Sequence, residues 1–257
     1  MSKQEAVSKQ GAVSGRRIFG LGISPLTAGQ IADKVVDEPP PAGRLGLIVT
    51  PNIQHVALLH GNPAFRRAYH NAAEIVCDGF PVHYYAKLRG APSPGRVTGC
   101  DIAMDIMGRR SFPARHRFFF VVDNQAAAAA IRTWAEERGV ASQTAVPAFG
   151  FDTDAARSDA LVEAIRAHGT TILFMGLGAP KSEMFVDTHR DRLPACWALC
   201  VGQAVKMALG LTPTPPGLVK ALNLEWAWRM ILEPRRMIGR YAYSVGGFLA
   251  AVARDLR

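Results

Sequence analysis

The chain has 257 residues, of which 49% are hydrophobic and 20% charged, so it can bury one substantial core. Its 30 Lys and Arg against 21 Asp and Glu give a formal net charge of +9 and a pI near 9.8. This balance predicts an anionic partner, either nucleic acid, anionic lipid or a diphosphate substrate, without choosing among them. The four cysteines, at positions 77, 100, 196 and 200, form no CxxC pair, which predicts a reducing, cytoplasmic compartment and no structural zinc.

The first residues of the chain carry lysines but no continuous apolar stretch before Arg16 and Arg17. We therefore predict a disordered tail over residues 1–16 and no secretory signal. No window reaches the roughly 18 to 20 apolar residues that a membrane-spanning helix requires, so we expect a protein that does not cross the bilayer.

Apolar runs alternate with helix-like stretches along the rest of the chain. We expect strands at 17–23, 45–49, 75–77, 118–122, 144–148, 171–175 and 197–201, and helices from residue 27 and over 52–60, 125–138 and 155–168. This rhythm predicts an α/β fold with a Rossmann-like, mostly parallel sheet, helices on both faces, and ligands at the carboxyl ends of the strands. A proline-rich break at 213–217 separates this body, residues 17–217, from a basic helical C-terminal appendage over 218–257.

Residues 176–183 follow one of these apolar runs directly with glycines, a proline, a cation and a carboxylate. Glycines let a ligand approach the backbone closely, and the amides at a helix start suit a phosphate. The same glycines also occur in α/β proteins for packing alone. On the ligand-binding interpretation, the candidates are Gly176, Gly178, Pro180, Lys181 and Glu183.

Polar residues follow other apolar runs in the same way. Thr50-Pro51-Asn52 follows 45–49, Asp78-Gly79-Phe80-Pro81 follows 73–77, and the segment from Arg96 to Asp101 opens a helix-like stretch. Each group has a purely structural alternative. Asp78 can hold a tight turn, Asn52, Thr98 or Asp101 can cap a helix, and Arg96 can simply pair with Asp101.

The C-terminal appendage has an excess of Lys and Arg, interleaved with Trp226, Trp228 and Tyr241. Such a helix can lie on an anionic bilayer, where each cation contributes about 1 kcal/mol, or it can close the core with its cations merely solvated.

The chain has a further signature near its C-terminus: Leu224-Glu225-Trp226-Ala227-Trp228-Arg229, then Glu233-Pro234-Arg235-Arg236 and Arg240-Tyr241. Together with this signature, the clusters resemble the WecG/TagA/CpsF glycosyltransferases from about residue 43 to about residue 241. The resemblance implies transfer of a hexose, N-acetylmannosamine or uronic-acid type sugar from a UDP-sugar to an undecaprenyl-diphosphate-linked acceptor, in exopolysaccharide or envelope polysaccharide synthesis. It also implies inversion at the anomeric centre, independence of a metal and of any cofactor, and a peripheral location on the inner face of the plasma membrane.

Carried onto this chain, the resemblance makes Asp78 the general base, with Thr50 and Asn52 positioning the sugar or acceptor. It places Arg96, Thr98 and Asp101 on the acceptor side. It makes three appendage side chains candidates for binding a diphosphate bidentately: Arg235, Arg236 and Arg240.

The chain departs from the family at three donor-side positions. Ser182 stands where members usually have Gln, Lys206 stands where they have Asp, and Thr214-Pro215-Pro216 replaces Arg-Ala-Pro. Lys206 reverses a charge and remains a substrate-binding candidate, and the changes leave open a different donor or lost activity. Asp152-Thr153-Asp154 resembles a metal-binding DxD triplet, but it precedes a helix, where Asp is a preferred cap, so we assign it no metal.

Two other classes fit the sequence less well. A dinucleotide-binding enzyme would need a third glycine where this chain has Lys181. A nucleic-acid-binding protein would use the basic charge, yet the cations gather at the C-terminus without a recognition motif, so we expect no nucleic acid partner. The sequence leaves open whether the chain forms a homo-oligomer.

Overall fold

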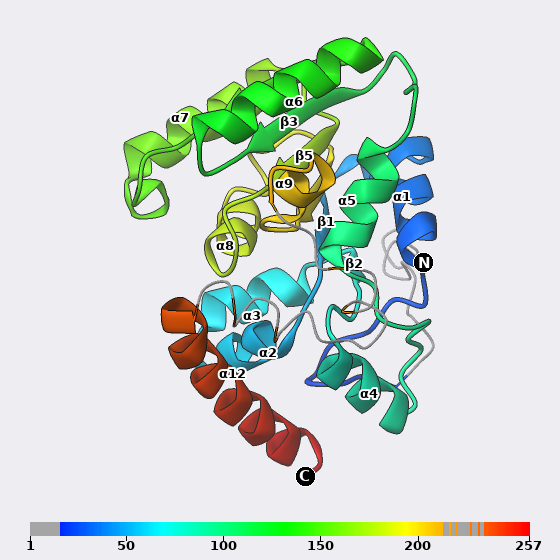
Figure 1. Cartoon of the computed structure of the whole chain (residues 1–257), viewed down its shortest axis with the longest axis vertical. Coiled ribbons are helices and arrows are strands. Elements are labelled where there is room, and N and C mark those ends of the chain that lie inside the picture. Colours follow the sequence, from blue (N-terminus) through cyan, green and yellow to red (C-terminus); the bar gives the residue numbers. More distant parts are fainter. Residues whose placement is uncertain (1–15, 213–215, 217–218, 220–226, 228–230, 232–233) are drawn as a thin grey trace, which may run out of the picture.

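The computed structural model of this chain describes residues 16–212, 216, 219, 227, 231 and 234–257. These residues form one six-stranded sheet in which every pairing is parallel, with the strand order β2-β1-β6-β5-β3-β4 (Figure 1). The strands are β1 (Gly46–Val49), β2 (Glu74–Ile75), β3 (Arg117–Val121), β4 (Ala141–Ala145), β5 (Ile172–Met175) and β6 (Trp197–Cys200). The α/β, parallel-sheet prediction is confirmed.

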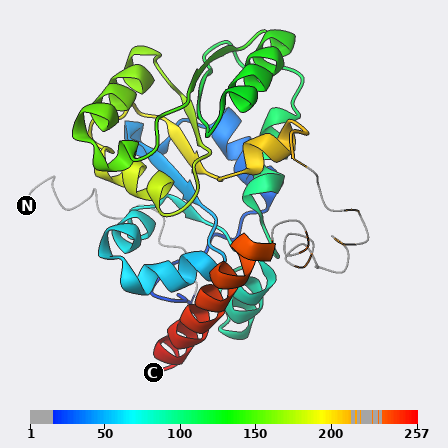
Figure 2. The same ribbon diagram turned by 60° about the vertical axis from the view of Figure 1, so that its left-hand side comes forward.

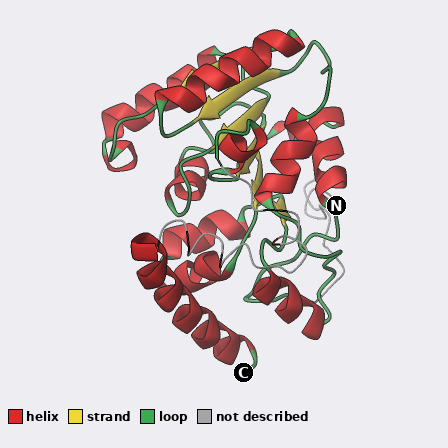
Figure 3. Cartoon of the chain, viewed as in Figure 1, coloured by secondary structure: helices red, strands yellow, loops and turns green. Residues whose placement is uncertain are grey.

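Helices cover both faces of the sheet (Figure 3). One face carries α2 (Ile53–Gly61), α3 (Pro63–His70), α4 (Phe80–Leu88), α7 (Ala155–Ala167), α8 (Lys181–Thr188) and α12 (Pro234–Asp255). The other carries α1 (Ala28–Asp37), α5 (Gly99–Met107), α6 (Gln125–Arg138) and α9 (Ala204–Ala208), while the short turns η1 (Pro41–Gly43) and η2 (Phe151–Thr153) lie in loops.

The central strands show why they appear in the sequence as continuous apolar runs. Along β1, Leu47 and Val49 belong to one buried cluster, whereas Ile48 between them belongs to the cluster on the opposite face. Because successive side chains of a strand point to opposite faces, a strand covered on both sides has to be apolar at every position. The strands β1, β5 and β6 are buried throughout.

The C-terminal helix α12 packs across α2 (Figure 2). A Cβ atom on Gly247 would lie 2.4 Å from the Cβ of Ala57, so glycine is what permits this close crossing. At the end of α12, the carboxylate of Asp255 accepts hydrogen bonds from the backbone N of Phe19 at 2.7 Å, the Tyr85 hydroxyl at 2.7 Å and the Arg89 guanidinium at 3.0 Å. The last turns of α12 are therefore docked on the α/β body. Within the described residues, no helix has the length and apolar character needed to cross a bilayer.

The expected strand at 17–23 is wrong. Phe19 and Gly20 have φ of 52° and 76°, and they form a tight turn closed by two hydrogen bonds between Ile18 and Leu21. Ile18, Leu21 and Ile23 are nevertheless buried, so the apolar pattern reports burial in this segment and not a strand.

The expected strand at 144–148 lies earlier in the chain, at β4, from Ala141 to Ala145. This strand pairs only with β3, and its alternate side chains are exposed, so it lacks the apolar run that marks the central strands. Pro147 has no N–H to donate to a ladder, which is consistent with the strand ending before it.

Candidate active site

The carboxyl ends of the six parallel strands bring most of the predicted site residues to one edge of the sheet. Following the strand order, the residues after β2 and β1 form one part, and those after β6, β5 and β3 form the other. We call the first part the Asp78 half, and it contains Thr50, Asn52, Asp78 and Arg96. We call the second part the glycine half, and it contains Gly176, Gly178, Lys181, Gly202 and Lys206.

In the Asp78 half, Thr50 and Asn52 follow β1. Thr50 is buried, whereas Asn52 is half-buried and caps α2, because its side-chain oxygen accepts hydrogen bonds from the backbone N of Gln54 at 3.0 Å and of His55 at 3.4 Å. The His55 ring accepts in return from the backbone N of Asn52 at 3.0 Å, which completes a capping box. The structural role proposed for Asn52 is therefore present, and its amide NH2 group is not used by the cap.

Asp78 follows β2 and lies beside Asn52. Its backbone N donates to the carbonyl of Pro51 at 3.0 Å, and a Cβ atom on Gly79 would lie 3.7 Å from that of Asn52. Gly79 has a φ of 110°, a backbone conformation that residues with a side chain rarely adopt, and α4 begins directly after it. The Asp78 carboxyl is half-buried and interacts with neighbouring groups.

Arg96 reaches the same place from a later segment. The backbone N of Val97 donates to the carbonyl of Cys77 at 2.9 Å, so this segment runs beside the residue before Asp78. The Arg96 guanidinium lies 5.4 Å from the centre of the Phe80 ring. A carboxylate and a guanidinium from the two ends of the segment that contains α4 thus lie within one loop cluster.

Thr98 and Asp101 form the capping box of α5. The Thr98 hydroxyl donates to Asp101 Oδ2 at 2.7 Å and accepts from the backbone N of Asp101 at 3.0 Å. The intervening Gly99 fits closely at the junction of the two halves, because a Cβ there would lie 3.2 Å from Val201 Cβ and 3.3 Å from Thr50 Oγ1. The capping alternative is realised for Thr98 and Asp101, and their acceptor-side role stays a prediction.

The glycine half consists of close backbone contacts. A Cβ atom on Gly176 would lie 2.9 Å from the carbonyl oxygen of Val121 and 3.4 Å from that of Gly202, and one on Gly202 would lie 3.8 Å from Gly178 Cα. Gly178 has a φ of 82°. Pro180 follows, and its carbonyl accepts the backbone N–H of Met184 in the first turn of α8. The ends of β3, β5 and β6 therefore meet here without side chains between them.

Lys181 begins α8 and already has two partners. Its Nζ lies 3.3 Å from Asp152 Oδ1 and 4.6 Å from the centre of the Phe149 ring. Asp154, the second carboxylate of the DxD triplet, caps α7 by accepting from the backbone N of Arg157 at 3.1 Å. No group of three or more His, Cys, Asp or Glu that could hold a metal ion occurs among the described residues.

Lys206 on α9 is paired with a carboxylate that follows β3. Its Nζ lies 3.0 and 2.8 Å from the two carboxylate oxygens of Asp123, and the Gln203 amide donates to the same carboxylate at 3.3 Å. Partial burial opposes ionisation of Asp123, but the hydrogen bonds from Lys206 and Gln203 and the charge of Lys206 lower its pKa. The charge reversal at position 206 is thus balanced within the protein.

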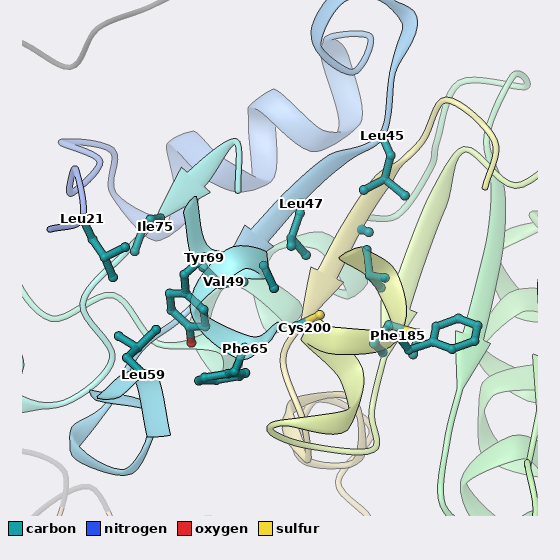
Figure 4. Packing of buried hydrophobic residues seen from close by; sticks show 14 of the residues in the cluster. Leu21, Leu45, Leu47, Val49, Leu59, Phe65, Tyr69, Ile75, Phe185 and Cys200 are labelled. Atoms are coloured by element: carbon teal, nitrogen blue, oxygen red, sulfur yellow. The ribbon is translucent and has the colours of Figure 1, made fainter. Parts of the chain in front are cut away.

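Glu183 lies one turn inside α8 and is buried, with 3% of its surface exposed. Burial raises the pKa of its carboxyl to about 7, and among the described residues Oε2 has no hydrogen-bond partner. Tyr69 on α3 is also fully buried. Burial, followed by the charges of Glu183, Cys200 and Asp78, raises the pKa of its hydroxyl. Figure 4 shows Tyr69 and Phe185 on opposite sides of Cys200.

Glu183 therefore belongs to a buried layer beneath the sheet edge. It lies one helical turn before Asp187, which accepts at 2.8 Å from Arg67 on α3 and at 2.8 Å from Asn71, the residue that follows this helix, so this side of α8 faces α3. The chain thus buries an ionisable carboxyl on α8, close enough to Tyr69 for its charge, in addition to burial, to raise the pKa of that hydroxyl.

The remaining predicted residues lie in the C-terminal part. Arg235, Arg236 and Arg240 belong to the first turns of α12, where only the helical backbone is described. Thr214, Trp226 and Trp228 lie outside the described residues.

Sequence reasoning missed two residues of this edge. Asp123 directly follows the apolar run that ends at Val122, so the criterion that identified Asp78 would also have found it. Phe149 lies in the loop after β4 and is 95% exposed. The sequence does not reveal this exposure, because it gives no sign whether a single aromatic residue in a loop is buried or exposed.

The arrangement suits group transfer from a phosphorylated donor. Glycine backbone and Lys181 can face an anionic diphosphate, while the Asp78 carboxyl, in the neighbouring half, can accept a proton. The junction at Gly99 brings the loops of both halves into contact.

Comparison with known proteins gives a consistent result. A family model described as "Glycosyl transferase WecG/TagA/CpsF family" matches residues 16–257. A protein of Bacillus spizizenii (strain W23) is 24% identical over 197 residues, which cover 76% of this chain and 74% of the relative. A protein of Staphylococcus aureus (strain NCTC 8325) is 24% identical over 214 residues, which cover 82% and 80%. Both relatives are named N-acetylglucosaminyldiphosphoundecaprenol N-acetyl-beta-D-mannosaminyltransferase.

Proposed function

Because the chain belongs to the WecG/TagA/CpsF glycosyl transferase family, we propose that it transfers an N-acetylhexosamine from a UDP-sugar to an undecaprenyl-diphosphate-linked saccharide. The names of the two relatives favour N-acetylmannosamine as the sugar and an N-acetylglucosamine-bearing lipid as the acceptor. The product would serve exopolysaccharide or envelope polysaccharide synthesis.

The observation that carries the mechanism is the half-buried residue Asp78 at the end of β2, on a loop that contacts the segments carrying Asn52 and Arg96. In the proposed step, the acceptor hydroxyl oxygen attacks the anomeric carbon, and its proton passes to Asp78. The bond between that carbon and the diphosphate breaks, and its electron pair leaves with UDP. Attack opposite to the leaving group inverts the anomeric centre.

The leaving diphosphate requires positive charge, because negative charge grows on it as the bond breaks. Lys181 lies at the glycine half, and Arg235, Arg236 and Arg240 would approach from α12. We propose that these cations stabilise the departing UDP without a metal ion.

The proposal favours a neutral sugar over a uronic acid. Lys206, the cation that replaces the family's Asp, is less available to a uronate, because its Nζ contacts both carboxylate oxygens of Asp123, at 3.0 and 2.8 Å. A neutral N-acetylhexosamine needs hydrogen-bond partners instead, and the Asn52 amide NH2 is suitable for that role.

We also propose that α12 brings the enzyme to the inner face of the membrane. Val245 and Leu249 are exposed and lie one helical turn apart on one side of α12, and the exposed Leu256 directly follows the end of the helix, while Ala251 on another side is buried. An exposed apolar stripe on a basic helix suits the bilayer interface. We expect Leu249→Glu to reduce co-sedimentation with anionic vesicles, and the exposed Met104→Glu on α5 to leave it unchanged. Equal binding of both variants would contradict this location.

The transferase proposal is tested with purified full-length protein, a synthetic N-acetylglucosaminyl-diphospho-lipid, and UDP-N-acetylmannosamine, UDP-N-acetylglucosamine or a UDP-uronic acid as donor. We expect the disaccharide product from UDP-N-acetylmannosamine, at a rate that EDTA does not change. Transfer that requires an added divalent cation would contradict the metal-independent step. A lack of product from every UDP-sugar, with no UDP binding, would contradict the function itself.

A further inference from the structure

Phe149 is the most exposed large hydrophobic side chain among the described residues, with 95% of its surface accessible. Single exposed apolar residues are common on protein surfaces, so exposure alone implies nothing. Phe149 also lies in the loop after β4, beside a switch point of the sheet, and a cation lies over one face of its ring.

The place is a switch point of the sheet. From β3 the chain continues through α6 to β4, whereas from the adjacent β5 it continues through α8 to β6, in the opposite direction along the sheet. Neighbouring parallel strands whose connections diverge leave a crevice at their carboxyl ends, where ligands of open α/β sheets bind. Gly176 and Asp123 follow these two strands, and the loop that carries Phe149 borders them, since the backbone N of Val122 donates to the carbonyl of Ala145 at 2.9 Å.

The neighbour is a cation. Lys181 Nζ lies 4.6 Å from the centre of the Phe149 ring, on one of its faces, and its ion pair with Asp152 at 3.3 Å holds it there. Since Phe149 remains almost wholly exposed, its other face is open to a planar ligand. Lys181 also begins α8 shortly after Gly176 and Gly178, so the residue that contacts the aromatic ring belongs to the same strand-to-helix segment as these glycines.

An aromatic face, a cation and a glycine backbone on neighbouring segments match the parts of a nucleoside diphosphate. We propose that Phe149 is the stacking platform for the nucleobase of the nucleotide-sugar donor, with Lys181 facing the adjoining diphosphate. This inference rests on the proposed function and adds a specificity-determining residue to its donor site. Stacking of a nucleobase on an aromatic side chain is typically worth about 1–3 kcal/mol, which corresponds to roughly 5- to 150-fold in affinity.

The test measures UDP and inorganic diphosphate binding to the full-length protein by isothermal titration calorimetry, together with the donor KM and kcat. We expect Phe149→Ala to weaken UDP binding and raise the donor KM roughly tenfold, with kcat and diphosphate binding nearly unchanged. Phe149→Trp retains a stacking face, so we expect it to bind UDP at least as well as the parent. The matched control is Leu88→Ala, which removes a 79% exposed side chain from α4 and should change neither quantity.

The possible results separate this inference from the proposed function. If the parent protein binds UDP and Phe149→Ala binds it equally well, the stacking platform is wrong and the transferase proposal stands. If Phe149→Ala weakens UDP and diphosphate binding to the same degree, Phe149 stabilises the conformation of its loop and does not stack on the nucleobase. If the parent protein binds no UDP-compound, the proposed function itself fails.

Discussion

The side chains of the Asp78 half also hold the backbone in place, whereas in the glycine half the strand ends approach closely because the residues at the contact have no side chains. Asn52 caps α2 in the first half, while Gly176 and Gly202 in the second allow three strand ends to approach within backbone contact. An alanine substitution in the Asp78 half can therefore lower the stability of the fold as well as the activity. In contrast, Lys181 of the glycine half and the neighbouring Phe149, which is 95% exposed, can be changed with little effect on the fold.

The largest expected effect is on the chemical step. Asp78→Asn keeps the size of the side chain and removes its basicity, and positioned general bases contribute roughly 10²–10⁴ in rate. We expect turnover to fall about a thousandfold, while UDP affinity and the melting temperature stay within error of the parent. Turnover, UDP affinity and melting temperature are all measured on the same preparation. Turnover within tenfold of the parent would mean that another group takes the acceptor proton.

The second effect tests the buried layer beneath the edge. Burial raises the pKa of Glu183 from 4.5 to about 7, so the folded state holds this proton more tightly than the unfolded state does. Its stabilising contribution is complete below pH 4.5 and is lost as the pH rises to about 7, a change of about 3 kcal/mol. Glu183→Gln cannot ionise, so its unfolding free energy should fall less than that of the parent between pH 5 and pH 8.

Urea denaturation at the two pH values measures this difference, and subtracting the variant from the parent removes the contribution of the other titrating groups. Equal pH dependence in both proteins would show that Glu183 has an ordinary pKa. The turnover of the same variant shows whether this carboxyl matters to the reaction. Glu183 and Asp78 both act on one group, because, in addition to burial, the charge of each raises the pKa of the Tyr69 hydroxyl.

The smallest effect separates the two roles of Asn52. Asn52→Asp keeps a side-chain oxygen to cap α2 but loses the amide donor, whereas Asn52→Ala loses both. We expect Asn52→Ala to lower the unfolding free energy by about 1 kcal/mol and Asn52→Asp to leave it nearly unchanged. Both variants should raise the KM of the sugar donor or the acceptor. If Asn52→Asp retains the parent kinetics, Asn52 is a cap and nothing more.

Much of the fold could be predicted because central strands buried on both faces require continuous apolar runs, such as 171–175. The same rule failed at 17–23, where Ile18 and Leu21 are buried by a tight turn and not by the sheet. It also displaced β4, since an edge strand with alternate exposed residues has little apolar signal. Apolar patterns report burial, and only strand pairing makes a buried segment a strand.

The candidate site was predictable to the extent that polar residues follow strand ends. That criterion indicated Asp78 and Thr50, yet it could not show that Lys206 finds its counter-charge in Asp123, which lies 83 positions away in the chain. It also could not show that Glu183 faces the interior, because the orientation of α8 depends on its packing against α3. Pairings and orientations of this kind arise only from tertiary contacts.

We infer that the two halves divide the reaction: the donor nucleotide binds in the glycine half, and the general base, Asp78, lies in the other half. Hydrogen–deuterium exchange of the full-length protein with and without saturating UDP tests it most directly. We predict slower exchange of the backbone amides in 176–181 and 202–206, with little change in 78–80. Protection confined to 50–52 and 78–80, with unchanged exchange in the glycine half, would contradict the division.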